Sequence, residues 1–324
     1  MSRRVTTAAV AALVLLSGCG GGDDETTTTG TGQAQRTTES QPAKTRPAKT
    51  PSTPAPAEKA VGIGEQGAAM FAAPLFKQLD VDKARRVVPW DATTAPGEAD
   101  LMRQWLDGAK AVGVEPFVTF GASRQKPTQL PTAAQFKQAF VAFRKQFPEV
   151  KVFAPWNEVN HKSQPTADHP DRAAAFYDVV RENCKGCTVV AADVLDQAGM
   201  ERYLARFRSA VRGKPRIWGL HNYSDTNRFR TKGTRAMLRA VPGEIWVTET
   251  GGVASFGRSF PFDLKRQARA LKYTFKLLDL SPRIRRLYVY NWTGAPAGAR
   301  FDAGLTNADG SPRPAYTTLQ RELR

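Results

Sequence analysis

Cysteine and histidine are both scarce, with three of each among 324 residues. A structural zinc site usually takes two pairs of Cys or His ligands, and this chain has only one close cysteine pair, Cys184 and Cys187. No P-loop and no G-x-G-x-x-G follows the first predicted strand, and no Ser-His-Asp order stands out. We therefore expect neither a metal site nor a cofactor.

Acidic residues are also few, with 30 Asp and Glu against 47 Lys and Arg, which gives a formal charge of +17. Seven basic and five acidic residues precede position 60, so the remainder carries about +15. Such a surface favours anionic surroundings such as phosphate-bearing wall polymers, acidic glycans, lipid head groups or nucleic acid, although it is also compatible with a merely solvated basic surface. No nucleic-acid-binding motif accompanies the charge, so we expect no nucleic-acid partner.

A long hydrophobic run is missing as well. Arg3 and Arg4 precede an apolar segment that is too short to span a bilayer, so residues 1–18 are predicted to be a secretory signal. The segment ends in Leu-Ser-Gly-Cys19, which resembles the lipobox of bacterial lipoproteins. That resemblance implies lipid attachment at Cys19 and an extracytoplasmic protein anchored to the bacterial cell membrane. The alternative is an ordinary signal peptide that happens to contain Cys.

Residues 19–59 are rich in Thr, Pro, Ala, Gly and Ser and have almost nothing to bury, so we expect a disordered tether. Residues 60–324 are long enough for one catalytic domain with a substantial core. In an exported, lipidated protein the two remaining cysteines, Cys184 and Cys187, are predicted to form a small disulfide at the end of a helix. We expect a monomer.

Short apolar runs alternate with helical patterns from Ala60 onward. The predicted strands are 61–64, 86–90, 116–121, 151–156, 188–194, 216–221, 244–248 and 286–291. They begin about 25 to 42 residues apart, which is the length of one βα unit, so the α/β fold expected is a (β/α)8 TIM barrel. An open doubly wound sheet is the alternative.

Aromatic spacing supports the helices between those strands. Phe136, Phe140, Phe143 and Phe147 recur at steps of four, three and four residues, which places them on one helical face. Further helices are predicted over 98–111, 171–183, 200–211 and 264–278.

Two glutamates follow predicted strands in similar settings. Glu158 ends the fourth strand in Lys-Val-Phe-Ala-Pro-Trp-Asn-Glu-Val-Asn-His, and Glu249 ends the seventh in Glu-Ile-Trp-Val-Thr-Glu-Thr-Gly-Gly. In an α/β barrel both would face one mouth. One carboxylic acid and one carboxylate, about 5 to 5.5 Å apart, are what retaining glycoside hydrolysis requires, whereas inverting enzymes hold the pair farther apart.

An Asn-Glu pair ending strand four and a Glu ending strand seven resemble clan A of the retaining glycoside hydrolases, a superfamily of (β/α)8 barrels. Residues 156–160, Trp-Asn-Glu-Val-Asn, are most similar to the W-N-E-P-N of family 39 and some members of family 5, with Val159 in place of the usual proline. The likeness covers Val61 to about Leu319. It implies a glycan substrate, with Glu158 as general acid/base and Glu249 as nucleophile.

The resemblance also implies supporting roles. Asn157 would bond the 2-hydroxyl of the sugar, Tyr223 would donate to Glu249, and His221 would border the subsite for the cleaved sugar. Arg86 on strand two is the expected partner of Glu249, with Arg85 as its rival. Trp292 after strand eight would form the floor of that subsite.

Other polar and aromatic residues fall at the same rim. Trp90 and Asp91 end strand two, where substrate contact and packing are equally compatible with the sequence, and we include Trp90 and Asn160 among the candidate substrate contacts. Glu65, Asp193 and His161 are weaker candidates. Trp218 and Trp246 are out of phase with His221 and Glu249, so they are expected to face the helices. A catalytically silent barrel that binds wall polysaccharide is the alternative function.

Overall fold

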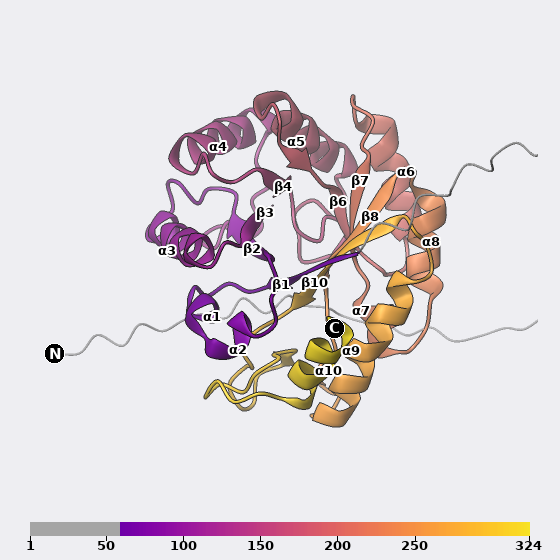
Figure 1. The fold of residues 1–324 in the computed structure, drawn as a ribbon. Coiled ribbons are helices and arrows are strands. Elements are labelled where there is room, and N and C mark those ends of the chain that lie inside the picture. Colours follow the sequence, from indigo (N-terminus) through magenta and orange to yellow (C-terminus); the bar gives the residue numbers. More distant parts are fainter. Residues whose placement is uncertain (1–58) are drawn as a thin grey trace, which may run out of the picture. The chain divides into compact units, whose positions relative to one another are not determined.

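The structure, a computed structural model, describes residues 59–324. The predicted signal peptide, the lipid attachment site at Cys19 and all of the tether except Lys59 lie outside the described residues. One sheet dominates the described part (Figure 1). Its nine strands are β1 (Ala60–Gly64), β2 (Lys83–Pro89), β3 (Glu115–Gly121), β4 (Val152–Ala154), β5 (Thr188–Val189), β6 (Ala191–Leu195), β7 (Ile217–His221), β8 (Glu244–Thr250) and β10 (Ile284–Tyr290).

The sheet closes on itself as a barrel. Its strand order is β5-β4-β3-β2-β1-β10-β8-β7-β6, and every pairing is parallel. The two end strands, β5 and β6, are separated by Val190 alone and are halves of one barrel strand. Because β5 pairs with β4 and β6 pairs with β7, that strand joins the two ends of the order. The predicted eight-stranded (β/α)8 barrel is confirmed.

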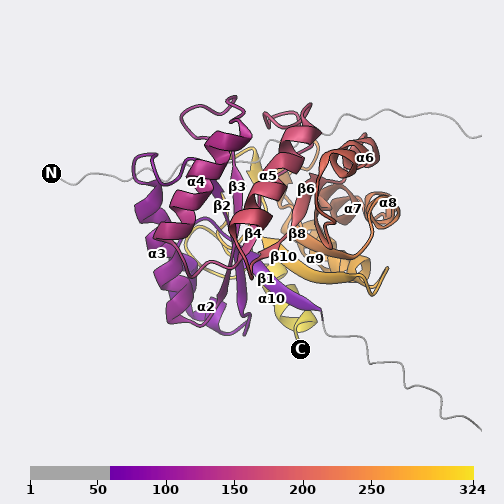
Figure 2. The ribbon, with the colours of Figure 1, turned by 90° about the horizontal axis from the view of Figure 1, so that it is seen from above.

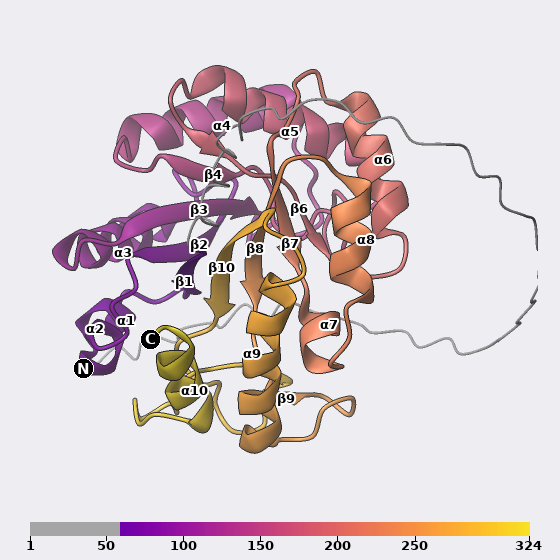
Figure 3. The ribbon, with the colours of Figure 1, turned by 45° about the vertical axis from the view of Figure 1, so that its right-hand side comes forward.

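Helices surround the barrel (Figure 2). They are α1 (Ala69–Ala72), α2 (Pro74–Lys77), α3 (Glu98–Ala111), α4 (Ala133–Gln146), α5 (Pro170–Asn183), α6 (Met200–Ala210), α7 (Tyr223–Asn227), α8 (Lys232–Ala240), α9 (Leu264–Leu278) and α10 (Pro314–Glu322). Figure 3 shows α6, α7, α8 and α9 on one side of the barrel, away from α3. No helix within residues 59–324 is long and apolar enough to cross a membrane.

Helix α4 illustrates how local sequence sets an element. Thr132 and Gln135 form a capping box that satisfies backbone donors at its first turn. The helix ends at Gln146, and its C-cap, Phe147, stands before Pro148, whose ring disfavours a helical conformation in the preceding residue. The predicted phenylalanine face is buried, and it packs around Phe120 of β3.

The core has two parts. The larger part lies between sheet and helices, and Trp218 belongs to it, against Phe207 of α6, as predicted. The smaller part fills the barrel with side chains from the strands and the β5–β6 junction, and Trp246 lies there against Phe117. The expectation that Trp246 faces the helices is therefore wrong.

A bulge in β8 explains the error. Leu220 pairs with Val247, but His221 pairs with Glu249, so β8 contains one extra residue, Thr248. The extra residue inverts the alternation of side chains beyond it. Trp246 and Glu249 can therefore both lie on the inner side of the barrel although they are three residues apart.

Two short strands and one disulfide complete the domain. β9 (Ser255–Phe256) and β11 (Phe301–Asp302) form an antiparallel pair. The predicted disulfide between Cys184 and Cys187 is present, between α5 and β5. Residues 59–324 thus contain a closed sheet, its helices and their core, which is what a segment needs in order to fold by itself.

Phe120→Ala should destabilise the domain by about 3 to 5 kcal/mol, because it removes a buried ring that contacts Phe136, Phe140 and Phe143 and leaves a cavity. The measurement is urea unfolding of residues 59–324. Phe229→Ala is the matched control, since that ring is 44% exposed. Equal losses in the two variants would contradict the packing described for Phe120.

Candidate functional site

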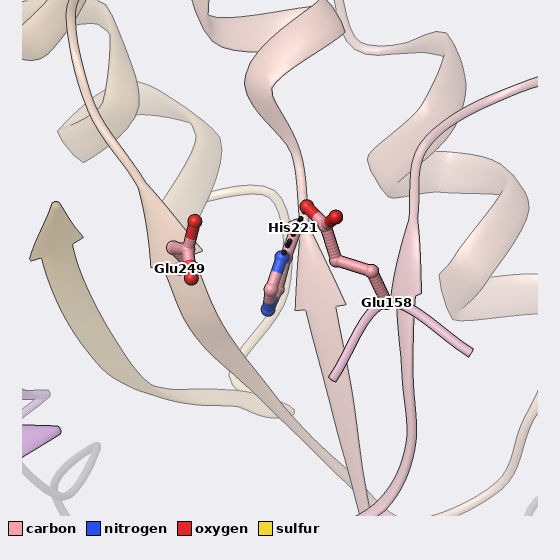
Figure 4. Close-up of side chains that lie close together, drawn as sticks. All are labelled: Glu158, His221 and Glu249. Atoms are coloured by element: carbon pink, nitrogen blue, oxygen red, sulfur yellow. Dashed lines mark hydrogen bonds and ion pairs between the residues drawn. The ribbon is translucent and has the colours of Figure 1, made fainter. Parts of the chain in front are cut away.

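Ionisable side chains from five strands meet at the carboxyl end of the barrel. Glu158 follows β4, His221 ends β7 and Glu249 lies near the end of β8, so all three project into the same space (Figure 4). Arg85 of β2 and Asp193 of β6 lie between them. All five side chains are buried.

The backbone around Glu158 is held on both sides. The N–H of Asn157 donates to Phe120 O of β3 at 2.7 Å, and that of Val159 donates to Asp193 O of β6 at 3.1 Å. Glu158 itself has φ +48°, a left-handed conformation that costs a non-glycine residue on the order of 1 kcal/mol. The tight turn that results aims the carboxylate back over the barrel.

Each oxygen of the Glu249 carboxylate accepts one hydrogen bond from a described residue. Arg85 Nη1 donates to Oε2 at 2.6 Å, and the Tyr223 hydroxyl donates to Oε1 at 3.1 Å. The hydrogen bond predicted for Tyr223 is thus present.

Arg85, rather than Arg86, is the partner of Glu249, so the prediction for Arg86 is wrong. β2 begins at Lys83, and the alternation of its side chains turns Arg85 inward and Arg86 outward. Arg86 donates to Leu101 O of α3. Besides Glu249, the Arg85 guanidinium contacts Thr119, the Asn157 Oδ1 atom at 2.7 Å and the Asp193 Oδ2 atom at 2.8 Å.

His221 bridges two acidic groups. Its Nδ1 lies 3.3 Å from Glu158 Oε1, and its Nε2 lies 3.3 Å from Asp193 Oδ2. Burial alone would lower the pKa of His221, but the charges of Asp193 and Glu249 outweigh burial and raise that pKa to about 10. Both ring nitrogens of an imidazolium donate, which fits an acceptor on each side.

Asp193 is the counterpart of that cation. Burial opposes its ionisation, yet His221 and Arg85 together hold the pKa of the Asp193 carboxyl well below its usual value. Gly219 of β7 makes room for it, because a Cβ there would lie 2.3 Å from Asp193 Oδ1. At neutral pH, Asp193 is therefore a carboxylate and His221 is an imidazolium.

One oxygen or nitrogen from each of Glu158, His221 and Glu249 lies within 4.8 Å of the other two. Three such groups can hold a metal ion only if the histidine is neutral. Because nearby carboxylates raise the pKa of His221 to about 10, a metal ion at this set would have to displace the proton of the imidazolium.

Three further predicted site residues, Asn157, Trp90 and His221, lie at or near this end of the barrel. Asn157 lies at the site, with its Oδ1 bonded to Arg85. Trp90 is half-buried at the rim, and its Nε1 is buried with no hydrogen-bond partner among residues 59–324, so its predicted substrate contact stays a prediction. His221 is fully buried between two carboxylates, and its predicted place at the border of a sugar subsite stays a prediction.

Asn160 and Trp292 have structural positions instead. The Asn160 side chain donates to Leu195 O and accepts from Leu195 N, which joins the turn after β4 to β6. The Trp292 indole packs against Phe76 and Tyr316 and is 4% exposed. Its predicted place as a subsite floor is wrong because β10 ends at Tyr290 and the chain then turns.

Glu65 enforces that turn. Its Oε2 accepts from the backbone N–H groups of Trp292 and Thr293, so the carboxylate fastens the end of β1 to the segment after β10. Glu65 is therefore a structural residue.

Tyr290 is an aromatic neighbour of Glu249 that the sequence analysis missed. Burial first, and the charges of Glu249 and Glu65 next, raise the pKa of its hydroxyl above the ordinary value. Its ring lies 6.3 Å from that of Phe301, which in turn contacts Tyr223. The period-two pattern of Tyr288 and Tyr290 on β10 was the available signal.

Known proteins resemble this chain in its sequence family and in its fold. A family model described as "Glycosyl hydrolase catalytic core" matches residues 120–318. A comparison with curated proteins finds no match. A family 39 glycoside hydrolase from the gut symbiont Bacteroides cellulosilyticus WH2 has TM-score 0.57 and 16% identity, with 81% of this chain and 63% of that chain covered. This chain therefore spans less than two thirds of that enzyme.

Two further structures are similar. GH5_18 from Streptomyces cattleya, in complex with GlcNAc, has TM-score 0.58 and 14% identity, with 82% of this chain and 80% of that chain covered. A family 128 endo-β-1,3-glucanase from Amycolatopsis mediterranei, in complex with laminarihexaose, has TM-score 0.55 and 13% identity, covering 82% and 99%. At the level of the fold, the likeness to families 39 and 5 is confirmed.

Asp193→Asn should lower the pKa of His221 from about 10 toward its ordinary value near 6.5, because a neutral amide no longer stabilises the imidazolium. The measurement is an NMR titration of the His221 ring, with Asp91→Asn as a control at the same rim but outside this network. A wild-type His221 that titrates near 6.5 would contradict the network.

Protonation of His221 also makes the stability of the fold depend on pH. Since the folded-state pKa of His221 lies above its unfolded value, its stabilising contribution is complete below about pH 6.5 and is lost as pH rises through about 10. Asp193→Asn should flatten that part of the stability profile.

Proposed function

The chain belongs to the glycosyl hydrolase catalytic core family, and on that basis we propose that it is a retaining hydrolase of β-linked glycans. The observation that carries the retaining assignment is the carboxylate pair, whose nearest oxygens lie within 4.8 Å. Retaining enzymes hold the two groups about 5 to 5.5 Å apart, whereas inverting enzymes leave roughly 6.5 to 9.5 Å for a water molecule.

In the first step, Glu249 attacks the anomeric carbon, the glycosidic C–O bond breaks, and Glu158 gives its proton to the departing oxygen. In the second step, Glu158 takes a proton from water, the hydroxide adds to the anomeric carbon, and the ester to Glu249 breaks. The Nδ1 atom of His221 is hydrogen-bonded to Oε1 of Glu158, while Oε2 is buried and has no partner among the described residues. The transferred proton is therefore placed on Oε2.

The neighbours of the carboxylates complete this scheme. Arg85 and Tyr223 orient Glu249 for attack. Because Arg85 holds the Oδ1 atom of Asn157, the Nδ2 group of Asn157 is the end left to donate to the sugar 2-hydroxyl. Tyr290 takes the role of aromatic surface beside the cleaved sugar that the sequence suggested for Trp292.

Glu158→Gln and Glu249→Gln should each lower hydrolysis of a natural β-glycan by roughly 1,000-fold or more, because each removes a group that reacts in the transition state. The measurement is reducing-sugar release by residues 59–324 across β-glucans, mannans, xylans and galactans. Glu115→Gln, at the opposite end of the barrel, is the matched control.

Two outcomes would count against the scheme. With an activated aryl leaving group, Glu158→Gln should keep its first step while Glu249→Gln stays inactive, so equal inactivity would contradict the roles assigned. NMR detection of an inverted anomeric product would refute retention. Undiminished retention of a polysaccharide by both variants, without any cleavage, would favour a silent binding barrel.

The proposal includes export and a lipid anchor at Cys19, which rest on the sequence of residues 1–19. Cys19→Ala in the full chain should release the protein from bacterial membranes, because no acyl chains can then be attached. The measurement is fractionation in about 0.5 M NaCl, which screens electrostatic adsorption. Unchanged membrane association under those conditions would refute the anchor.

A further inference from the structure

The positive charge of the domain is concentrated on one side of the barrel. Helices α6, α8 and α9 together carry eleven basic residues and one acidic residue. Helices α3, α4 and α5 carry seven basic and six acidic residues. Figure 3 shows α6, α8 and α9 on the side of the barrel away from α3, so the excess of basic residues belongs to one side of the domain.

Helix α9 organises that charge as a stripe. Lys265, Arg269, Lys272 and Lys276 recur at steps of four, three and four residues, and all four are exposed. The face opposite them packs into the core, so the stripe points directly away from the barrel. It extends over about 16 Å of helix. None of the four forms a salt bridge with a residue in 59–324.

Two exposed phenyl rings flank the stripe. Phe229, 44% exposed, lies between Arg228 and Arg230, and its ring contacts Tyr273 of α9 at 5.5 Å. Phe262, 62% exposed, precedes Asp263, the residue that caps α9. These are the only exposed phenylalanines among the large hydrophobic side chains of the described residues. Phe229 thus lies against α9 itself, and Phe262 lies at the N-terminal end of α9, with its ring centroid 6.0 Å from the Arg313 guanidinium.

We propose that this α9 face, Lys265, Arg269, Lys272, Lys276, Phe229 and Phe262, docks the domain on an anionic phospholipid bilayer. The four cations would contact headgroup phosphates while the two rings enter the interface. Exposed rings beside the charges favour a bilayer over a soluble polyanion, because a polyanion offers no apolar layer to receive them. The inference concerns the domain itself and goes beyond the proposed hydrolysis and the anchor at Cys19.

The test is co-sedimentation of residues 59–324 with vesicles of phosphatidylcholine alone or with about 30% phosphatidylglycerol. Binding is expected only to the anionic vesicles and should be lost at about 0.5 M NaCl. Lys265→Gln, Arg269→Gln, Lys272→Gln and Lys276→Gln together should weaken it by roughly 600-fold, at about fivefold for each charge near the surface. Hydrolysis of a soluble glycan should not change.

The control is a variant that loses four positive charges on another part of the domain. It combines Lys77→Gln, Lys110→Gln, Lys137→Gln and Lys145→Gln, all exposed and all on α2, α3 or α4. This control is expected to keep most of the vesicle binding. Equal weakening in both quadruple variants, or no binding by the wild type, would overturn the proposal.

The phenyl rings separate a bilayer from other anions. Phe229→Ser with Phe262→Ser should weaken vesicle binding about tenfold or more and leave binding to soluble polyphosphate unchanged. Leu101→Ser with Val141→Ser, the other two exposed large hydrophobic residues, is the control. Vesicle binding that is insensitive to the phenyl pair would overturn the bilayer as partner and favour a soluble polyanion.

Discussion

A buried guanidinium ties together the strands that carry the site. Arg85 of β2 reaches Thr119 of β3, Asn157 beyond β4, Asp193 of β6 and Glu249 of β8. A buried charge is tolerable only when its donors are satisfied, and here four side chains accept hydrogen bonds from the guanidinium. The same contacts that make Arg85 compatible with burial thus hold Glu249 and Asn157, the proposed nucleophile and the proposed sugar-binding amide, in register.

A second charged pair extends this arrangement to Glu158. His221 and Asp193 neutralise each other inside the barrel, and the spare donor of His221 points to Glu158. The two glutamates therefore differ in environment although they lie close together. Glu249 faces a guanidinium and a phenol, whereas Glu158 faces an imidazolium on one oxygen only. That asymmetry supports the proposed division between nucleophile and acid.

The barrel and the glutamate pair could be predicted because the apolar strands recur at the spacing of βα units, and Glu158 and Glu249 fall at the ends of two of them. The exact register of each strand could not be predicted. Choosing Arg85 over Arg86 required knowing that β2 starts at Lys83, and placing Trp246 required knowing that Thr248 is an extra residue in β8. Trp292 was misplaced because the carboxylate of Glu65, distant in sequence, redirects the chain after β10. Such errors of one residue arise from tertiary contacts that a local pattern does not contain.

The side chain of Asn160 has a consequence for how this barrel can diverge. Its two hydrogen bonds to Leu195 fasten the turn that carries Glu158 to β6, a strand of the barrel itself. The position of Glu158 is therefore set by the barrel strands, and changes in surface loops need not alter it.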